Sequence, residues 1–169
     1  PEAHKLMAII YNKTGWPEEA HQHEQYCSDY LFNRNFIDCN LLVMSFPKSG
    51  RTWIRTLMAR VIQQTYNLSS LPILSADEWN SQLWPKILFS HGNSPGDDGI
   101  SVNLPDEFFK TNKPFILLIR DPRDVLVSNY FHLTRRTRIF QPSLSLDEFA
   151  KDKIHGLKAI LSFMSFWKK

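Results

Sequence analysis

Residues 40–53 read Asn-Leu-Leu-Val-Met-Ser-Phe-Pro-Lys-Ser-Gly-Arg-Thr-Trp, and this stretch decides the fold class. Residues 40–46 form an apolar run of strand length, which is typical of a parallel strand buried on both faces. Beyond the Pro-Lys-Ser-Gly turn, apolar residues recur at helical spacing. They are Trp53, Ile54, Leu57, Met58, Val61 and Ile62. The stretch predicts a buried strand, a tight turn and a helix in immediate succession.

The turn between this strand and helix has the groups that hold an anion. A helix N-terminus offers backbone N–H groups, and its dipole favours negative charge. Gly50 lets the backbone approach a ligand closely, and Lys48 adds a positive charge. Ser49 and Thr52 add hydroxyl donors. The turn is not a Walker A loop, because that motif places its lysine after the last glycine and here it comes before. We predict a phosphate or sulfate site, with an ordinary turn whose lysine points into water as the alternative.

A second candidate anion site follows another apolar run. Residues 115–119 predict a third buried strand that ends at Arg120. Arg120 would lie at the C-terminal strand edge, where open α/β sheets bind ligands. Ser128 follows about two helical turns later, on a side that can face Arg120, and an arginine with a hydroxyl suits one phosphate. The alternative is a surface ion pair between Arg120 and Asp121 or Asp124.

Positive charge gathers at these two places. Residues 39–60 hold four basic side chains and no acidic one, and residues 120–138 hold five basic against two acidic side chains. The whole chain has 20 Lys and Arg against 17 Asp and Glu, a net charge of +3, which is too mild for a nucleic-acid coat protein. The pattern indicates an anionic ligand held at two points, and we expect no nucleic-acid partner.

The remaining chain alternates between helical and strand patterns. Helices are predicted over residues 17–32 and 122–133. Two capping boxes predict further helices, a short one that begins at residues 75–78 and one that begins at 145–148 and runs to about residue 167. Between them, a strand is predicted over residues 87–89, a loop over 92–103 and a helical turn over 105–110. This order implies an α/β fold with a parallel sheet flanked by helices. We expect one domain over residues 1–169, and we expect the protein to continue beyond Lys169, because only three strands are visible.

Composition excludes several classes of protein. Of the 169 residues, 43% are hydrophobic, which suffices for a core and excludes disorder along the whole chain. No apolar run is long enough to span a bilayer and no leader opens the chain, so a cytoplasmic location is the default expectation. A Golgi enzyme stripped of its anchor would look similar. Cys27 and Cys39 match no metal or redox spacing, which favours reduced, buried thiols. His21 and His23 are better explained as solvated than as a metal site, and we expect no metal.

Together, the two anion-binding segments resemble the sulfotransferases that use 3′-phosphoadenosine 5′-phosphosulfate (PAPS). Residues 46–53 resemble their 5′-phosphosulfate loop, and residues 120–128 resemble their 3′-phosphate motif. The likeness extends loosely over residues 36–167 and implies the P-loop NTPase-like sulfotransferase fold, without the basic C-terminal loop that completes the family's cofactor site. It implies that Lys48 and the backbone of Ser49, Gly50, Arg51 and Thr52 hold the 5′-phosphosulfate, that Trp53 contacts the adenine, and that Arg120 and Ser128 hold the 3′-phosphate.

The resemblance also implies a reaction. A histidine at the end of the corresponding strand is the family's general base, and His91 resembles it; imidazole can accept a proton from a hydroxyl near neutral pH. A structural histidine at the strand end is the alternative. The sulfuryl group would pass in line from PAPS to a hydroxyl or amine of a small-molecule or glycan acceptor, leaving adenosine 3′,5′-bisphosphate (PAP). Lys48 would stabilise the leaving phosphate. Many cytosolic members have a lysine two residues before this histidine, where this chain has Phe89.

The acceptor is poorly specified by the sequence. Five aromatic side chains could line an acceptor pocket, although each is better explained as core: Trp79, Trp84, Phe89, Phe131 and Phe140. Arg135, Arg136 and Arg138 could meet an acidic acceptor, but such a charge run is better explained as a solvated face. The oligomeric state is not specified.

Two other functions stay open at this point. A Mg²⁺-dependent P-loop kinase-like enzyme would use Lys48 on phosphates and Asp121 as a Walker B-like acid, although the order of Lys48 and Gly50 disfavours it. A non-catalytic or inactive module would bind the bisphosphorylated nucleotide without any transfer.

Overall fold

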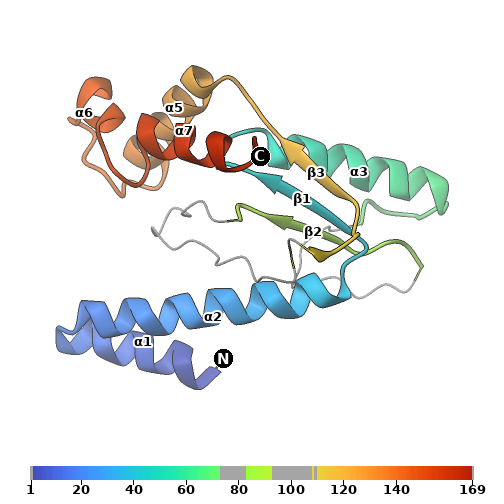
Figure 1. Ribbon diagram of the computed structural model, residues 1–169, viewed down its shortest axis with the longest axis horizontal. Helices are drawn as coiled ribbons and strands as arrows, with labels where there is room; N and C mark the ends of the chain where they lie inside the picture. The colour runs from blue at the N-terminus through green and yellow to red at the C-terminus, as the bar shows by residue number, and fades with distance from the viewer. Residues whose placement is uncertain (1, 73–82, 93–107, 109, 169) are drawn as a thin grey trace.

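Three parallel strands form the centre of the protein (Figure 1). The computed structural model describes residues 2–72, 83–92, 108 and 110–168. Within these ranges the strands are β1 (Leu41–Ser45), β2 (Ile87–Ser90) and β3 (Phe115–Leu118), in the sheet order β2-β1-β3. Their arrows point the same way in Figure 1, so the C-terminal ends of all three meet at one edge of the sheet. The predicted α/β fold with a parallel sheet and flanking helices is confirmed.

The central strand is buried on both faces, as its sequence predicts. Leu42 pairs with Leu88 of β2 on one side and with Phe115 of β3 on the other, and its side chain is fully buried. The prediction of a buried third strand was wrong. Phe115 is 48% exposed and Ile116 is 37% exposed, because no strand among the described residues lies beyond β3.

Helix α3 (Arg51–Thr65) covers one face of the sheet. Its inner side chains Ala59 and Ile62 pack with Val43 and Ile87 of the strands. Only part of the predicted apolar face of this helix is buried. Ile54 and Met58 pack against the core, whereas Trp53, Leu57 and Val61 are 78%, 59% and 60% exposed and form an outer stripe.

The opposite face is covered by helices from both ends of the chain. The end of α2 (Pro17–Asp38) packs Phe32 and Phe36 against Met44 and Leu88. Helices α5 (Pro122–Phe131) and α7 (Leu157–Phe166) form a neighbouring cluster, with Val125, Ile160 and Phe163 packed around Phe46. Both cysteines are buried, as predicted, Cys39 in the first cluster and Cys27 in α2, and no disulfide joins them.

Helix α1 (Glu2–Thr14) was not predicted, and α2 extends beyond the predicted end at residue 32. The two form an antiparallel pair, visible as the lowest layer of Figure 1. His23 is not solvated as predicted, because its Nδ1 lies 2.6 Å from Nδ1 of His4 and its ring stacks on Tyr11. His21, by contrast, is exposed. Of the helices that the structure describes, none is both long enough and apolar enough to cross a membrane.

The expected single helix over residues 146–167 is two helices, α6 (Leu146–Ala150) and α7. The predicted capping box is present, since Ser145 Oγ accepts from Glu148 N–H and Glu148 accepts from Ser145 N–H. The helix then ends because Asp152 Oδ1 accepts from the backbone N–H groups of Ile154 and His155. The chain turns back so tightly at Gly156 that a Cβ there would lie 2.6 Å from the Ala150 carbonyl oxygen.

The region after α5 also differs from expectation. The helix predicted to residue 133 ends at Phe131 as an α-helix and continues as a π-helix, η1 (His132–Arg136). The first capping box at 75–78, Trp79, nearly all of the predicted loop at 92–103 and most of the predicted turn at 105–110 lie outside the described residues.

Candidate functional site

The turn after β1 has the tight backbone that its sequence predicts. Lys48 and Gly50 have φ values of +67° and +104°, and Ser49 N–H donates to the Phe46 carbonyl over 3.2 Å. Gly50 is the N-cap of α3 and provides no side-chain hydrogen bond to the helix. The N–H groups of the first turn therefore face the space in front of the helix, where an anion can accept from them.

Gly50 gives a prediction with a matched control. A side chain at φ +104° is strained, although the nearest atom to an added Cβ is Leu118 Cδ2 at 4.0 Å. We expect Gly50→Ala to lower the unfolding free energy by about 1 to 2 kcal/mol. Gly15 has φ +85° in the turn between α1 and α2, also with open space around it, so Gly15→Ala should cost a similar amount. Denaturant unfolding measures both.

Only the Gly50 variant should also weaken binding of adenosine 3′,5′-bisphosphate, measured by calorimetry. Equal affinities for the two variants would show that the backbone of this turn does not contact the nucleotide.

A pocket of about 620 Å³ opens in front of this turn. It is lined by Pro47, Lys48, Gly50, Arg51, Thr52, Trp53, His91, Arg120, Ser128 and His132. The structure thus brings together residues from the ends of all three strands, although they lie far apart in the sequence. Every predicted site residue lines the pocket except Ser49, which is buried behind the turn with its hydroxyl unpaired among the described residues.

Arg120 joins the two predicted anion sites. Its Nη1 donates to the Lys48 carbonyl over 3.2 Å, so the end of β3 is held against the turn after β1. Its Nε lies 3.6 Å from Asp124 Oδ2, which shows that the ion pair proposed as an alternative is also formed. One guanidinium makes both contacts and still lines the pocket, so the ion pair does not remove Arg120 from the site.

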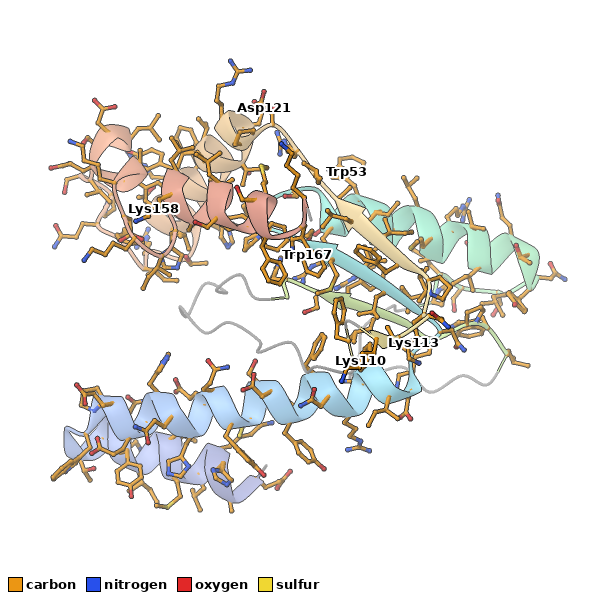
Figure 2. All side chains as sticks on the ribbon, viewed as in Figure 1. Trp53, Lys110, Lys113, Asp121, Lys158 and Trp167 are labelled. Carbon is orange, nitrogen blue, oxygen red and sulfur yellow. The ribbon has the colours of Figure 1, made fainter. Side chains whose placement is uncertain are left out.

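Asp121 fixes the start of α5 and does not pair with Arg120. Its carboxylate is the N-cap and accepts from Arg123 N–H over 2.9 Å. The Arg123 side chain donates to both Asp121 oxygens, over 3.0 and 2.6 Å. These hydrogen bonds lower the pKa of the Asp121 carboxyl to about 2. Figure 2 shows Asp121 at the turn between β3 and α5, and Trp53 at the start of α3, on the same side of the molecule.

The lowered pKa gives an acid-titration prediction. A carboxyl whose pKa is lower in the folded state stabilises the fold above its unfolded value of 3.8, and the contribution is lost as the pH falls through about 2. Arg123→Gln removes the main cause, so we expect the pKa of Asp121 to rise toward 3.8, as measured by carbon NMR of the carboxyl. Glu148, whose pKa is lowered by the Ser145 hydroxyl, should not change. An unchanged Asp121 would contradict this assignment of the cause.

His91 is oriented by the central strand. Its Nδ1 lies 2.8 Å from the carbonyl oxygen of Ser45, the last residue of β1. A carbonyl oxygen can only accept, so Nδ1 carries the hydrogen. In the neutral ring, Nε2 therefore has the lone pair, and the ring lines the pocket beside Lys48 and Arg120. The geometry suits an imidazole that accepts a proton through Nε2.

Phe89 lies two residues before His91 and points toward α3, where it packs against the core. The guanidinium carbon of Arg55 lies 4.9 Å from the centre of its ring, a cation–π contact. Many cytosolic sulfotransferases have a lysine at the position of Phe89, and here the guanidinium of Arg55 places a positive charge over the Phe89 ring. Sequence reasoning missed this contact because it joins two separate elements.

The remaining candidates fall outside the pocket. Trp84 packs against the α3 cluster, Phe140 packs edge-on against Phe149, and Phe131 is 54% exposed. Arg135, Arg136 and Arg138 are exposed, in agreement with a solvated face. Among the described pocket residues, sequence reasoning assigned no role to Pro47 or to His132. The available signal for His132 was its spacing of four residues from Ser128, which places both side chains on one helix face.

Known proteins match the part of the chain that builds this pocket. The sulfotransferase domain family matches residues 38–168. The 3-beta-hydroxysteroid sulfotransferase of Cavia porcellus is 27% identical, over 70% of this chain and 43% of its own length. Sulfotransferase 6B1 of Mus musculus is 26% identical, over 77% and 45%, and Sulfotransferase 2A1 of Mus musculus is 31% identical, over 54% and 34%. The chain spans less than half the length of each of these relatives. No solved structure matches it.

The family match includes all three strands, the turn after β1 and both helices that line the pocket. It covers more than half of the chain, and it coincides with the parallel sheet and the pocket at the C-terminal strand edge. The chain therefore belongs to the sulfotransferase domain family.

Proposed function

We propose that this chain binds PAPS in the pocket at the C-terminal strand edge and transfers its sulfuryl group to a hydroxyl or amine of a small-molecule or glycan acceptor. The observation that carries the proposal is the contact between Arg120 and the Lys48 carbonyl. It holds two anion-binding segments at one pocket of about 620 Å³, which suits a nucleotide with phosphate groups at both ends of its ribose.

Each part of the donor has a matching group in the pocket. Lys48 and the first N–H groups of α3 would hold the 5′-phosphosulfate, with Arg51 and Thr52 beside it. Arg120 and Ser128 would hold the 3′-phosphate. Trp53 is 78% exposed at the pocket wall, where its indole can stack on the adenine. All these groups are donors, cations or an aromatic surface, as a multiply charged nucleotide requires.

The transfer needs one base and one group that stabilises the leaving phosphate. His91 Nε2 would take the acceptor proton as the acceptor oxygen or nitrogen forms its bond to sulfur. The bond from sulfur to the bridging oxygen breaks at the same centre, and PAP leaves with the bond's electron pair. Lys48 and the loop N–H groups would stabilise the negative charge that grows on that oxygen. The charges and atoms balance without a metal ion.

A transfer assay tests the proposal. Sulfur-labelled PAPS is incubated with the protein, with EDTA, and with either a 3β-hydroxysteroid or a phenol as acceptor. The steroid is chosen because one relative is named a 3-beta-hydroxysteroid sulfotransferase. We expect label to pass to an acceptor and to require both the acceptor and the protein. Transfer that appears only after Mg²⁺ is added would contradict the proposed chemistry.

A second function is favoured by one observation. The described lining of the pocket contains groups that suit nucleotide binding as well as the candidate base, so binding of PAP or PAPS without transfer is the second function. Tight PAP binding without any transfer would support this function. For either function we propose a reducing compartment such as the cytoplasm, because both cysteines are buried and no disulfide joins them.

A further inference from the structure

His132 lines the same pocket, although it belongs to neither anion-binding motif. It is the last residue that keeps α-helical hydrogen bonding in α5, because its N–H donates to the Ser128 carbonyl and its backbone is helical. Ser128 and His132 are therefore true i and i+4 neighbours. Side chains with this spacing have Cβ atoms about 5–6 Å apart on one face of a helix. A phosphate accepting hydrogen bonds from both sides fits between two donors at that separation.

The ring of His132 is oriented by its surroundings. Its Nδ1 is buried, so Nε2 is the nitrogen that can face the pocket. The backbone is fixed where the π-helix begins, since the His132 carbonyl accepts from Thr137 N–H over 2.9 Å. The next two side chains, Leu133 and Thr134, are fully buried. The imidazole is thus held at the pocket wall by the packing of the residues that follow it.

The charges around His132 favour an anion in front of it. From the turn after β1 come Lys48 and Arg51, from the end of β2 comes His91, and from the end of β3 comes Arg120. Within η1 itself, Arg135 and Arg136 are exposed. Of the described residues that line the pocket, none is acidic, and the nearby carboxylate of Asp124 pairs with Arg120. A phosphate in front of His132 can therefore accept from the imidazole N–H with no described carboxylate of the pocket lining competing for it.

We propose that His132 is a third ligand of the 3′-phosphate, donating from Nε2 beside Arg120 and Ser128. This inference rests on the proposed function, because it assigns a residue to the 3′-phosphate site. It adds a third donor to the arginine and the serine, at a position outside the predicted 3′-phosphate motif at residues 120–128.

Calorimetry on the whole chain tests this inference. Adenosine 3′,5′-bisphosphate and 5′-AMP are each titrated into the wild-type chain and into its variants. We expect His132→Asn to weaken bisphosphate binding about tenfold, because a hydrogen bond to a charged phosphate is lost. Binding of 5′-AMP, which lacks the 3′-phosphate, should change less than about twofold. His21→Asn, an exposed histidine on α2, should change neither ligand.

The outcomes separate this inference from the proposed function. Equal losses for both ligands, or no loss for either, would overturn the role of His132. If the wild-type chain binds the two ligands equally, the 3′-phosphate site itself is wrong and the inference falls with it. If Arg120→Ala discriminates between the ligands and His132→Asn does not, only the inference fails. His132→Gln serves as the second variant if the asparagine variant does not fold.

Discussion

His91→Ala should slow sulfuryl transfer by about 10²- to 10⁴-fold, the usual contribution of a general base, and leave the affinity for adenosine 3′,5′-bisphosphate within about twofold. The reason is the hydrogen bond from Nδ1 to the Ser45 carbonyl, which leaves Nε2 with the lone pair in the neutral ring. Steady-state rates measure the first effect in a preparation that transfers sulfuryl groups, and calorimetry measures the second. His21→Ala, on the exposed side of α2, is the matched control and should change neither.

Retained turnover in the His91 variant would exclude it as the base. An equal fall in nucleotide affinity would instead make it a binding residue. The tautomer can be checked on the chain itself, because nitrogen NMR distinguishes a protonated Nδ1 from a protonated Nε2. A neutral His91 with its hydrogen on Nε2 would contradict the hydrogen bond that orients the ring.

Arg120→Ala should weaken binding of adenosine 3′,5′-bisphosphate by about 10- to 100-fold, because a hydrogen bond to a charged group is worth about 1.5–3 kcal/mol. The affinity for 5′-AMP should fall much less. Arg123→Ala is a close control: Arg123 lies three residues later, its side chain is 86% exposed, and it pairs with Asp121 outside the pocket. Calorimetry with both ligands on both variants gives the comparison.

The Arg120 result has two informative alternatives. Equal losses for the two ligands would mean that Arg120 acts by holding the turn through the Lys48 carbonyl, and that it does not contact the 3′-phosphate. Equal effects of Arg120→Ala and Arg123→Ala would mean that general positive charge at this edge, and no specific contact, sets the affinity.

The centre of the fold could be predicted because its signals are local. The run at residues 40–46 is apolar enough to require burial on both faces, and Gly50 is required by its positive φ. The capping box at Ser145 and Glu148 is also local, and it forms as predicted. Each of these features depends on residues within a few positions of one another, where the sequence pattern is informative.

Other parts of the fold depend on contacts that a local pattern does not contain. Helix α1 exposes Leu6, Ile9 and Ile10, so its apolar pattern does not mark a core-facing side. Its contact with α2 includes the polar and aromatic side chains of His4 and Tyr11, which meet His23. The break between α6 and α7 needs the Asp152 carboxylate and the close backbone approach at Gly156. Neither is visible in the apolar spacing, which continues across the break.

In the site, too, the features with a local signal were predicted and those that depend on tertiary contacts were missed. The two anion-binding segments were predicted from strand ends and charge, and the structure brings them to one pocket. His132 was missed because it becomes a pocket residue only when α5 lies along the sheet edge. Ser49, included because its hydroxyl is next to Gly50, is turned inward by the tight backbone and lies behind the turn. Side-chain direction in such a turn follows from φ and ψ, which residue types alone do not determine.

Thermal unfolding of the chain with adenosine 3′,5′-bisphosphate, compared with 5′-AMP and with ADP plus Mg²⁺, tests the central claim most directly. A ligand at about 100 times its Kd adds roughly 2.7 kcal/mol of apparent stability. We predict a clear rise in the melting temperature with the bisphosphate, in the presence of EDTA, and a much smaller rise with 5′-AMP. A rise only with ADP and Mg²⁺ would contradict the account and favour a kinase-like nucleotide site.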